Sequence, residues 1–218
     1  MIRDLTDAMQ DYVKEIYKRR REGKRATTSA IAERMGVRPP SVSAMLKRLA
    51  ALGLAEHAPY RGVELTPAGE RVALEVIRHH RLLEQYLAQA LGLSLDEVHS
   101  EADRLEHALS EELEARIDRS LGYPTHDPHG DPIPDAHLRI DRKRLRTLAS
   151  LEPGDEATIR RVPDGDDELL RYLTKLALVP GKKVKLRAAE PFGGPLTVRV
   201  GKSDHAISRE LAGGIGVT

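Results

Sequence analysis

The stretch from Ser94 to Leu109 restricts the possible folds of this chain more than any other part of the sequence. Ser94 with Glu97 three residues later is a capping-box signature, which marks the start of a helix. At about 100° per residue, the stretch places an apolar stripe on one helix face, and we expect part of it to form a dimer contact. The neighbouring face carries two imidazoles and two carboxylates, namely His99, Asp103, Glu106 and His107. First-row divalent metals take such groups as ligands, so we predict a helix that packs with one face and binds metal with the next.

The composition limits where the protein works and which chemistry it has. The 218 residues include no cysteine, which excludes disulfides, thiolate zinc sites and cysteine nucleophiles and is consistent with a reducing cytoplasm. The N-terminus has no apolar run of signal-peptide length, and no stretch approaches the roughly 20 apolar residues that span a bilayer. We therefore expect a cytoplasmic protein that does not enter the membrane.

Charge is distributed unevenly along the chain. Residues 1–75 hold 14 lysines and arginines against 10 acidic residues. Residues 76–121 hold 5 against 10, together with four of the nine histidines. This asymmetry is expected when an anionic polymer and a cation bind to different parts of one protein.

The N-terminal third has the pattern of a helix-turn-helix. Apolar residues recur with a helical period over 5–20, and a second helix follows a cap at Thr27 or Thr28. Gly36 makes a tight turn, and a third helix opens at Pro39, a residue that first helical turns favour. A helix, a glycine turn and a second helix that begins with small polar residues form this motif.

Two strands, 54–57 and 62–65, follow and enclose a basic turn, which completes a winged helix-turn-helix. A generic helical bundle is the alternative, but it would not explain why hydroxyls and cations share one exposed face of the third helix. Such groups make phosphate and base-edge contacts. The residues that we expect to contact DNA are Thr28, Ser29, Arg38, Pro40, Ser41, Ser43, Lys47, Arg48 and Arg61.

The rest of the chain divides into a helical middle and a β-rich tail. Helices are expected over 67–91 and 110–121 on either side of the central one. Residues 122–135 hold four prolines and two glycines, so we interpret them as a linker whose histidines bind nothing specific. Strands at 155–162, 182–189 and 196–201, a helix at 167–177 and two further strands, 205–207 and 214–218, would complete a small β-barrel. The expected domains are 1–73, 74–121, the linker 122–144, and 145–218.

These features resemble the diphtheria-toxin-repressor-like, metal-dependent transcriptional regulators. The resemblance covers essentially the whole chain. It rests on the winged helix and on the motifs His80–Glu84, Val98–His107 and Pro128–Pro134. The tail 151–218, with its segment Leu178–Val184, looks like the family's SH3-like domain, which ferrous-transport accessory proteins share. It implies a mainly α fold with a small β domain: a winged helix-turn-helix DNA-binding domain, a helical metal-binding and dimerisation domain, and a C-terminal SH3-like β-barrel.

The resemblance also implies two metal sites per subunit. One would comprise Asp11, Asp103, Glu106 and His107. The other would comprise His80, Glu84 and His99, completed from the SH3-like domain by Asp166 and Glu168.

The iron-selective branch of the family places sulfur ligands at the positions of Asp11 and Asp103. Carboxylates at both positions favour Mn²⁺ over Fe²⁺. Short manganese regulators carry a second acid one turn after the first, where this chain has Lys14. Two separate sites are therefore expected rather than a closely bridged pair of ions.

The resulting hypothesis is a non-enzymatic, homodimeric transcriptional regulator of metal-ion homeostasis, a repressor or an activator. It would bind double-stranded operator DNA when Mn²⁺ or Fe²⁺ is bound and would take no small organic substrate. A dinuclear metallohydrolase is the main alternative, because two metals held by histidines and carboxylates can activate water. A winged-helix regulator whose metals are only structural is a further alternative. A regulator that binds an organic ligand is disfavoured, because the middle domain offers charges rather than an apolar pocket.

Overall fold

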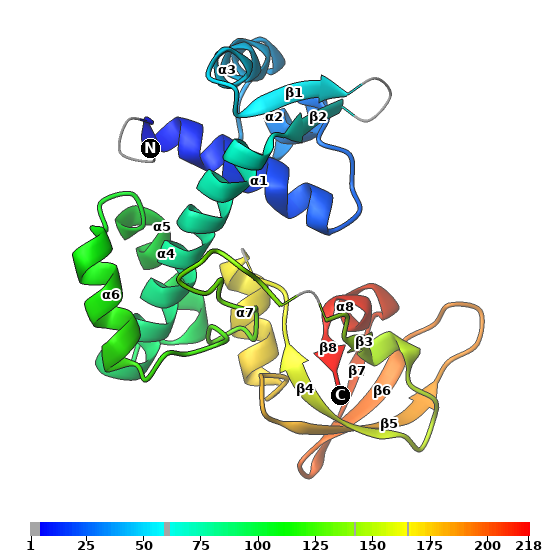
Figure 1. Ribbon diagram of the computed structural model, residues 1–218. Coiled ribbons are helices and arrows are strands. Elements are labelled where there is room, and N and C mark those ends of the chain that lie inside the picture. Colours follow the sequence, from blue (N-terminus) through cyan, green and yellow to red (C-terminus); the bar gives the residue numbers. More distant parts are fainter. Residues whose placement is uncertain (1–4, 59–61, 142, 165) are drawn as a thin grey trace. The chain divides into compact units, whose positions relative to one another are not determined.

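The structure, a computed structural model, describes residues 5–58, 62–141, 143–164 and 166–218 (Figure 1). The chain forms two compact units. The first contains Met1–His79, Glu106–Ala108 and Pro134–Arg139, and the second contains the remaining residues. Among the described helices, none combines the length and the apolar composition needed to cross a bilayer.

The first unit contains the predicted winged helix-turn-helix. Threonine side chains cap two of its helices: the hydroxyl of Thr6 accepts from the Met9 amide, and that of Thr27 from the Ala30 amide. Capping of this kind satisfies backbone N–H groups that have no partner within the helix. The elements are α1 (Asp7–Arg21), α2 (Thr28–Arg34), α3 (Pro39–Ala51), β1 (Ala55–Ala58), β2 (Gly62–Leu65) and α4 (Pro67–Leu91), the last of which continues into the second unit.

The core of the first unit is mostly aliphatic. Val13 and Ile16 of α1, Ile31 of α2, and Val42 and Leu49 of α3 are fully buried in one cluster. The strands β1 and β2 pair antiparallel and form the wing beside α3 (Figure 1). This packing leaves the outer side of α3 exposed, as a helix that reads DNA requires.

The second unit combines several helices with a six-stranded sheet in the part of the chain that the structure describes. Its helices are the end of α4, α5 (Leu95–Leu105), α6 (Glu111–Ser120), the 3-10 turn at Leu148–Ser150, α7 (Asp167–Lys175) and α8 (Arg209–Gly214). Its strands are β3 (Arg146–Thr147), β4 (Glu156–Arg161), β5 (Lys183–Ala189), β6 (Leu196–Val200), β7 (Ser203–Ile207) and β8 (Gly216–Val217). The sequence analysis did not predict α8 or β3.

The C-terminal sheet is open, which corrects the expected closed barrel. Its strands run antiparallel in the order β3-β8-β4-β5-β6-β7 (Figure 1). Within the described residues β3 pairs only with β8 and β7 only with β6, so the two ends of the sheet do not join. Helix α8 packs beside the short strand β3 and its 3-10 turn at one end of the sheet.

The central helix is shorter than predicted. It ends at Leu105, and Glu106–Ala108 form a turn, whereas the periodicity predicted a helix to Leu109. Nδ1 of His79 donates to the Glu106 carbonyl at 3.1 Å, which stabilises the turn. The four polar residues expected on one helical face are therefore divided: two remain on α5 and two lie in the turn.

The segment 122–135 is an ordered structural element rather than a free linker. The Asp127 carboxylate accepts from the backbone amides of His129 and Asp131, both at 2.9 Å, which fixes a tight turn. The Val162 amide donates to the His129 carbonyl at 2.9 Å. Gly130 has φ +90°, and a Cβ there would lie 1.8 Å from the Arg160 carbonyl oxygen, so only glycine fits.

Candidate metal centre

The first candidate group joins α1 to the turn after α5, within the first unit. Nε2 of His107 lies 3.0 Å from Oδ1 of Asp11, and its Nδ1 lies 2.8 Å from Oε1 of Gln10. Oε1 of Glu106 lies 3.5 Å from the same Nε2 and 2.6 Å from Nζ of Lys14. Asp11, Glu106 and His107 each offer one donor atom to a shared position, and Glu106 is buried.

Hydrogen bonding favours the protonated form of His107. The hydrogen bond to Asp11, aided by the charges of Glu106 and Asp11, raises the pKa of His107 although partial burial opposes it. A metal can bind the imidazole only after the proton on that nitrogen has left. Metal binding by this group would therefore release a proton.

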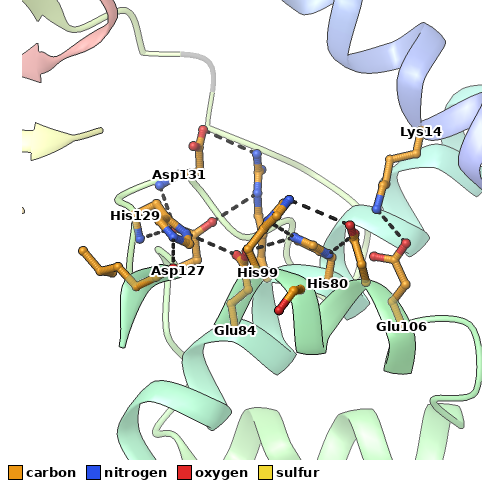
Figure 2. A network of polar contacts seen from close by, with 12 residues as sticks. Lys14, His80, Glu84, His99, Glu106, Asp127, His129 and Asp131 are labelled. Carbon is orange, nitrogen blue, oxygen red and sulfur yellow. Dashed lines mark hydrogen bonds and ion pairs between the residues drawn. The ribbon is translucent and has the colours of Figure 1, made fainter. Parts of the chain in front are cut away.

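The second candidate group surrounds Glu84 of α4 in the second unit. Oε1 of Glu84 lies 2.9 Å from Nε2 of His80 and 3.0 Å from Nδ1 of His99, and the two nitrogens are 3.2 Å apart (Figure 2). Adjacent ligands of an octahedral ion, at bonds of about 2.1 Å and 90°, are about 3.0 Å apart. The three atoms thus have the spacing of one face of an octahedron, with the donor set of a two-histidine, one-carboxylate site.

Asp103 adds a carboxylate on the other side of these histidines. Its Oδ1 lies 3.2 Å from Nδ1 of His80, and its Oδ2 lies 3.8 Å from Nε2 of His99. The resemblance assigned Asp103 to the group of Asp11, and that assignment stays a prediction.

A third group shares Glu84 and comes from the supposed linker. Glu84, Asp127 and His129 are all buried, and each offers a donor atom to one position. Oε2 of Glu84 and Nδ1 of His129 are 3.6 Å apart, and neither has a hydrogen-bond partner in the described structure (Figure 2). Buried polar atoms without partners are costly, and a cation between them would satisfy both. These residues therefore fit a metal.

The charges around Glu84 support the same conclusion. Burial opposes its ionisation, yet the charge of His80, the nearby imidazole of His129 and hydrogen bonds from His80 and His99 hold the pKa of Glu84 well below its usual value. Burial disfavours the charged imidazole of His129, but the Glu84 carboxylate 3.6 Å away raises the pKa of His129 to about 9. The protonated imidazole of His129 thus supplies positive charge beside the buried carboxylate.

Arg81 fixes the loop that carries His129. Its guanidinium donates to the Pro132 carbonyl at 2.6 Å and lies 3.4 Å from the carboxylates of Asp127 and Asp131. Nε2 of His129 donates to the Leu95 carbonyl at 3.0 Å, at the start of α5. The free ring nitrogen of His129 is therefore directed toward Glu84.

The two ligands expected from the SH3-like domain have other positions. Oδ1 of Asp166 caps α7 by accepting from the amides of Glu168 and Leu169. Neither Asp166 nor Glu168 belongs to the three groups found among the described residues. The structure thus gives Asp166 a helix-capping role and leaves its predicted metal role without support.

Sequence reasoning missed Asp127 and His129. The proline-rich composition of their segment suggested a solvated linker, and His129 was expected to bind nothing specific. An acid and a histidine fixed in a Pro-Gly turn, inside a motif that carried the resemblance, were the available signal. His126 and His137 are exposed.

Most residues expected to contact DNA are exposed on the surface of the first unit. Ser41, Ser43, Lys47 and Arg48 are exposed on α3, and Arg38 is the exposed N-cap residue of that helix. Pro40 and Ser29 are also exposed, and Thr28 is partly buried at the start of α2. Arg61 lies outside the described residues.

Comparison with known proteins identifies the domains. The iron dependent repressor N-terminal DNA binding domain matches residues 4–63, and the iron dependent repressor metal binding and dimerisation domain matches residues 66–135. The FeoA domain matches residues 146–218. Together these matches cover nearly the whole chain.

Full-length relatives agree with the domain matches. The iron-dependent repressor IdeR of Mycobacterium tuberculosis is 34% identical over 221 residues, which are 96% of each chain. The diphtheria toxin repressor of Corynebacterium efficiens is 38% identical over 230 residues, covering 98% of this chain and all of that protein. A solved manganese-dependent transcriptional repressor in complex with manganese has a TM-score of 0.85 and 36% identity, covering 96% of this chain and 98% of that one.

These relatives are repressors, which favours the regulator over the metallohydrolase alternative. Identity above 30% over nearly the full length shows common family membership. The chain therefore belongs to the iron- and manganese-dependent transcriptional repressors related to the diphtheria toxin repressor, and it is a metal-dependent DNA-binding regulator.

Proposed function

We propose that this protein is a homodimeric, cytoplasmic repressor of metal-homeostasis genes that binds operator DNA when Mn²⁺ or Fe²⁺ occupies its metal groups. One observation carries the proposal. Asp11 belongs to the first helix of the DNA-binding domain, and it lies 3.0 Å from His107, which follows the central helix. A metal shared by these residues and Glu106 would tie the two segments together.

Each subunit would hold two ions in this proposal. Asp11, Glu106 and His107 would hold one, and the cluster around Glu84 would hold the other, with His80 and His99 on one carboxylate oxygen and His129 facing the other. All these donors are oxygen or imidazole nitrogen, which favours Mn²⁺ over Fe²⁺. The ion supplies positive charge and a fixed link between its ligands.

The DNA-reading residues would be those exposed on α2, α3 and the wing. Ser41 and Ser43 would approach bases or phosphates, while Lys47, Arg48 and Arg61 would supply the salt-dependent affinity. We assign DNA binding to residues 1–73, metal binding and dimerisation to 74–121, connection to 122–144, and the SH3-like domain to 145–218.

Metal would act through linkage between the two binding events. Without metal, hydrogen bonds and an ion pair hold α1 to the turn after α5, and the DNA-binding domains would still sample many orientations. Metal selects the arrangement in which the two recognition helices of the dimer meet successive major grooves, roughly 34 Å or a multiple apart. Because linkage is reciprocal, operator DNA should tighten metal binding by the same factor.

The test is DNA binding with and without metal. DNA would be selected from a random pool by the Mn²⁺-loaded protein, and its affinity would then be measured in MnCl₂ and in EDTA. We expect at least about tenfold tighter binding with Mn²⁺, the range of typical coupling energies. Equal affinity in EDTA, or a selection that enriches no sequence, would contradict the proposal.

A further inference from the structure

Lys14 of α1 contacts a candidate metal ligand directly. Its Nζ lies 2.6 Å from Oε1 of Glu106, and the two side chains are only 12% and 1% exposed (Figure 2). Lys14 lies one helical turn after Asp11, so both side chains are directed from the same part of α1 toward the turn after α5. The ion pair is therefore part of the first candidate group rather than a surface contact.

A buried carboxylate needs a nearby positive charge. Removing an ion from water costs several kcal/mol unless an opposite charge lies beside it. The Lys14 ammonium provides that charge for Glu106.

The same carboxylate oxygen faces the other metal donors. Oε1 of Glu106, which accepts from Lys14, is also the oxygen 3.5 Å from Nε2 of His107. An ammonium has no lone pair and cannot coordinate a metal. A divalent ion bound at this oxygen would therefore have to displace Lys14 or bind against its positive charge.

We propose that Lys14 is a built-in competitor of the metal: its ammonium occupies Glu106 in the metal-free protein and is exchanged for the divalent ion. The inference rests on the proposed metal site of Asp11, Glu106 and His107. Lys14 stabilises the metal-free fold and also raises the metal concentration at which the site fills. The flexible four-carbon side chain lets the ammonium move away without a change in the helix.

The test compares Mn²⁺ binding by the wild-type chain and by Lys14→Met, which keeps most of the side-chain volume and removes the charge. MnCl₂ is titrated by calorimetry in a Glu84→Gln background, which removes the second proposed ion. Because a nearby unit charge costs a divalent ion several kcal/mol at an effective dielectric constant near 20, we expect at least about tenfold tighter binding by Lys14→Met. Lys24→Met, which removes an exposed ion pair with Glu22, is the matched control and should bind like the wild type.

Stability provides an independent readout. In EDTA, Lys14→Met should lower the melting temperature by about 5–10 °C because Glu106 loses its counter-charge, and saturating Mn²⁺ should remove most of the difference. If Lys14→Met does not fold in EDTA, the double variant Lys14→Met/Glu106→Gln should fold again, because both charges are then absent. Failure of this rescue would overturn the proposal, as would wild-type or weaker Mn²⁺ binding by folded Lys14→Met.

Asp11→Asn, measured in parallel, separates this inference from the function on which it rests. If Asp11→Asn binds Mn²⁺ like the wild type, the metal site itself is wrong. If Asp11→Asn loses Mn²⁺ but Lys14→Met shows no gain, the site stands and the competitor role of Lys14 is wrong.

Discussion

Nε2 of His107 lies 3.0 Å from Oδ1 of Asp11, although 96 residues separate the two in the chain. The contact joins the first helix of the DNA-binding domain to the turn that ends the central helix. Both nitrogens of this imidazole contact side chains of α1, namely Gln10 and Asp11, so the histidine makes the central contacts of the group. The first prediction follows from this contact.

Asp11→Asn should uncouple DNA binding from metal. The amide keeps the size of the side chain but loses the negative charge, so we expect Mn²⁺ affinity at this group to fall at least about tenfold. Mn²⁺-dependent DNA binding should fall with it, as measured by fluorescence anisotropy. Asp7→Asn, an exposed acid one turn earlier on α1, is the control. DNA binding that survives complete metal loss would instead support the alternative in which the metals are only structural.

Metal stoichiometry should depend on Glu84. The wild-type chain is expected to bind two Mn²⁺ per subunit, and Glu84→Gln only one, because one oxygen of this carboxylate contacts His80 and His99 and the other faces His129. His99→Gln and His129→Gln then report which carboxylate oxygen holds the ion. If His99→Gln loses more Mn²⁺ affinity in calorimetry, the ion binds at Oε1 of Glu84, and if His129→Gln loses more, it binds at Oε2. A count of two in Glu84→Gln would contradict the assignment.

Stability of the metal-free protein should fall as the pH rises from about 6.5 to 9. The folded-state pKa of His129 is about 9, above the value of about 6.5 expected in the unfolded chain. A histidine whose pKa is higher in the folded state contributes its full stabilisation when the pH is below the pKa of the unfolded chain. This stabilisation is lost as the pH rises through the pKa of the folded state. The shift corresponds to about 3 kcal/mol as an upper bound. Urea melts in EDTA at pH 6.5 and 9 would measure it, and His129→Gln should remove most of the difference.

Metal affinity should change with pH in the opposite direction. His107 and His129 have raised pKa values in the metal-free protein, so each must lose a proton before its nitrogen can bind an ion. Mn²⁺ affinity should therefore increase by up to about tenfold per pH unit and per proton between pH 6 and 8. Calorimetry in two buffers of different ionisation enthalpy would count the protons. Equal heats in both buffers would show that no proton is released.

Gly130→Ala should destabilise the second unit far more than Gly122→Ala. Both glycines have positive φ, +90° and +73°, so the backbone strain of alanine is common to the two variants. Only at Gly130 would the new Cβ meet a backbone oxygen, at 1.8 Å, whereas nothing lies within 4 Å at Gly122. We expect about 1 kcal/mol for Gly122→Ala and about 3 kcal/mol or more for Gly130→Ala. Urea melts in EDTA would measure both, and equal losses would show that the loop is not fixed against β4.

Local sequence signals predicted most of the helical framework. The cap at Thr27, one of the two threonines considered, Pro39 in the first turn of α3, and the glycine turns each act within a few residues, and the predicted helices agree with the structure at these points. Ser94 and Glu97 also cap α5 as predicted, with the Ser94 amide donating to the Glu97 carboxylate at 2.9 Å.

The candidate site depends on contacts that no local pattern contains. The central helix ends at Leu105 without a glycine or proline there, in a turn whose side chains contact α1 more than 90 residues away in sequence. His129 was missed for a related reason. Its segment has the composition of a linker, but hydrogen bonds from Val162 and to Leu95 fix it in the second unit.

The three candidate groups contain imidazoles and carboxylates, and the whole sequence has no cysteine. Peroxide converts thiolates to sulfenic acids and thioethers to sulfoxides, so sensors that ligate through sulfur lose ligands during oxidative stress. A donor set of nitrogen and oxygen offers no such sulfur target. Peroxide would therefore remove no metal ligand of these groups through oxidation of sulfur.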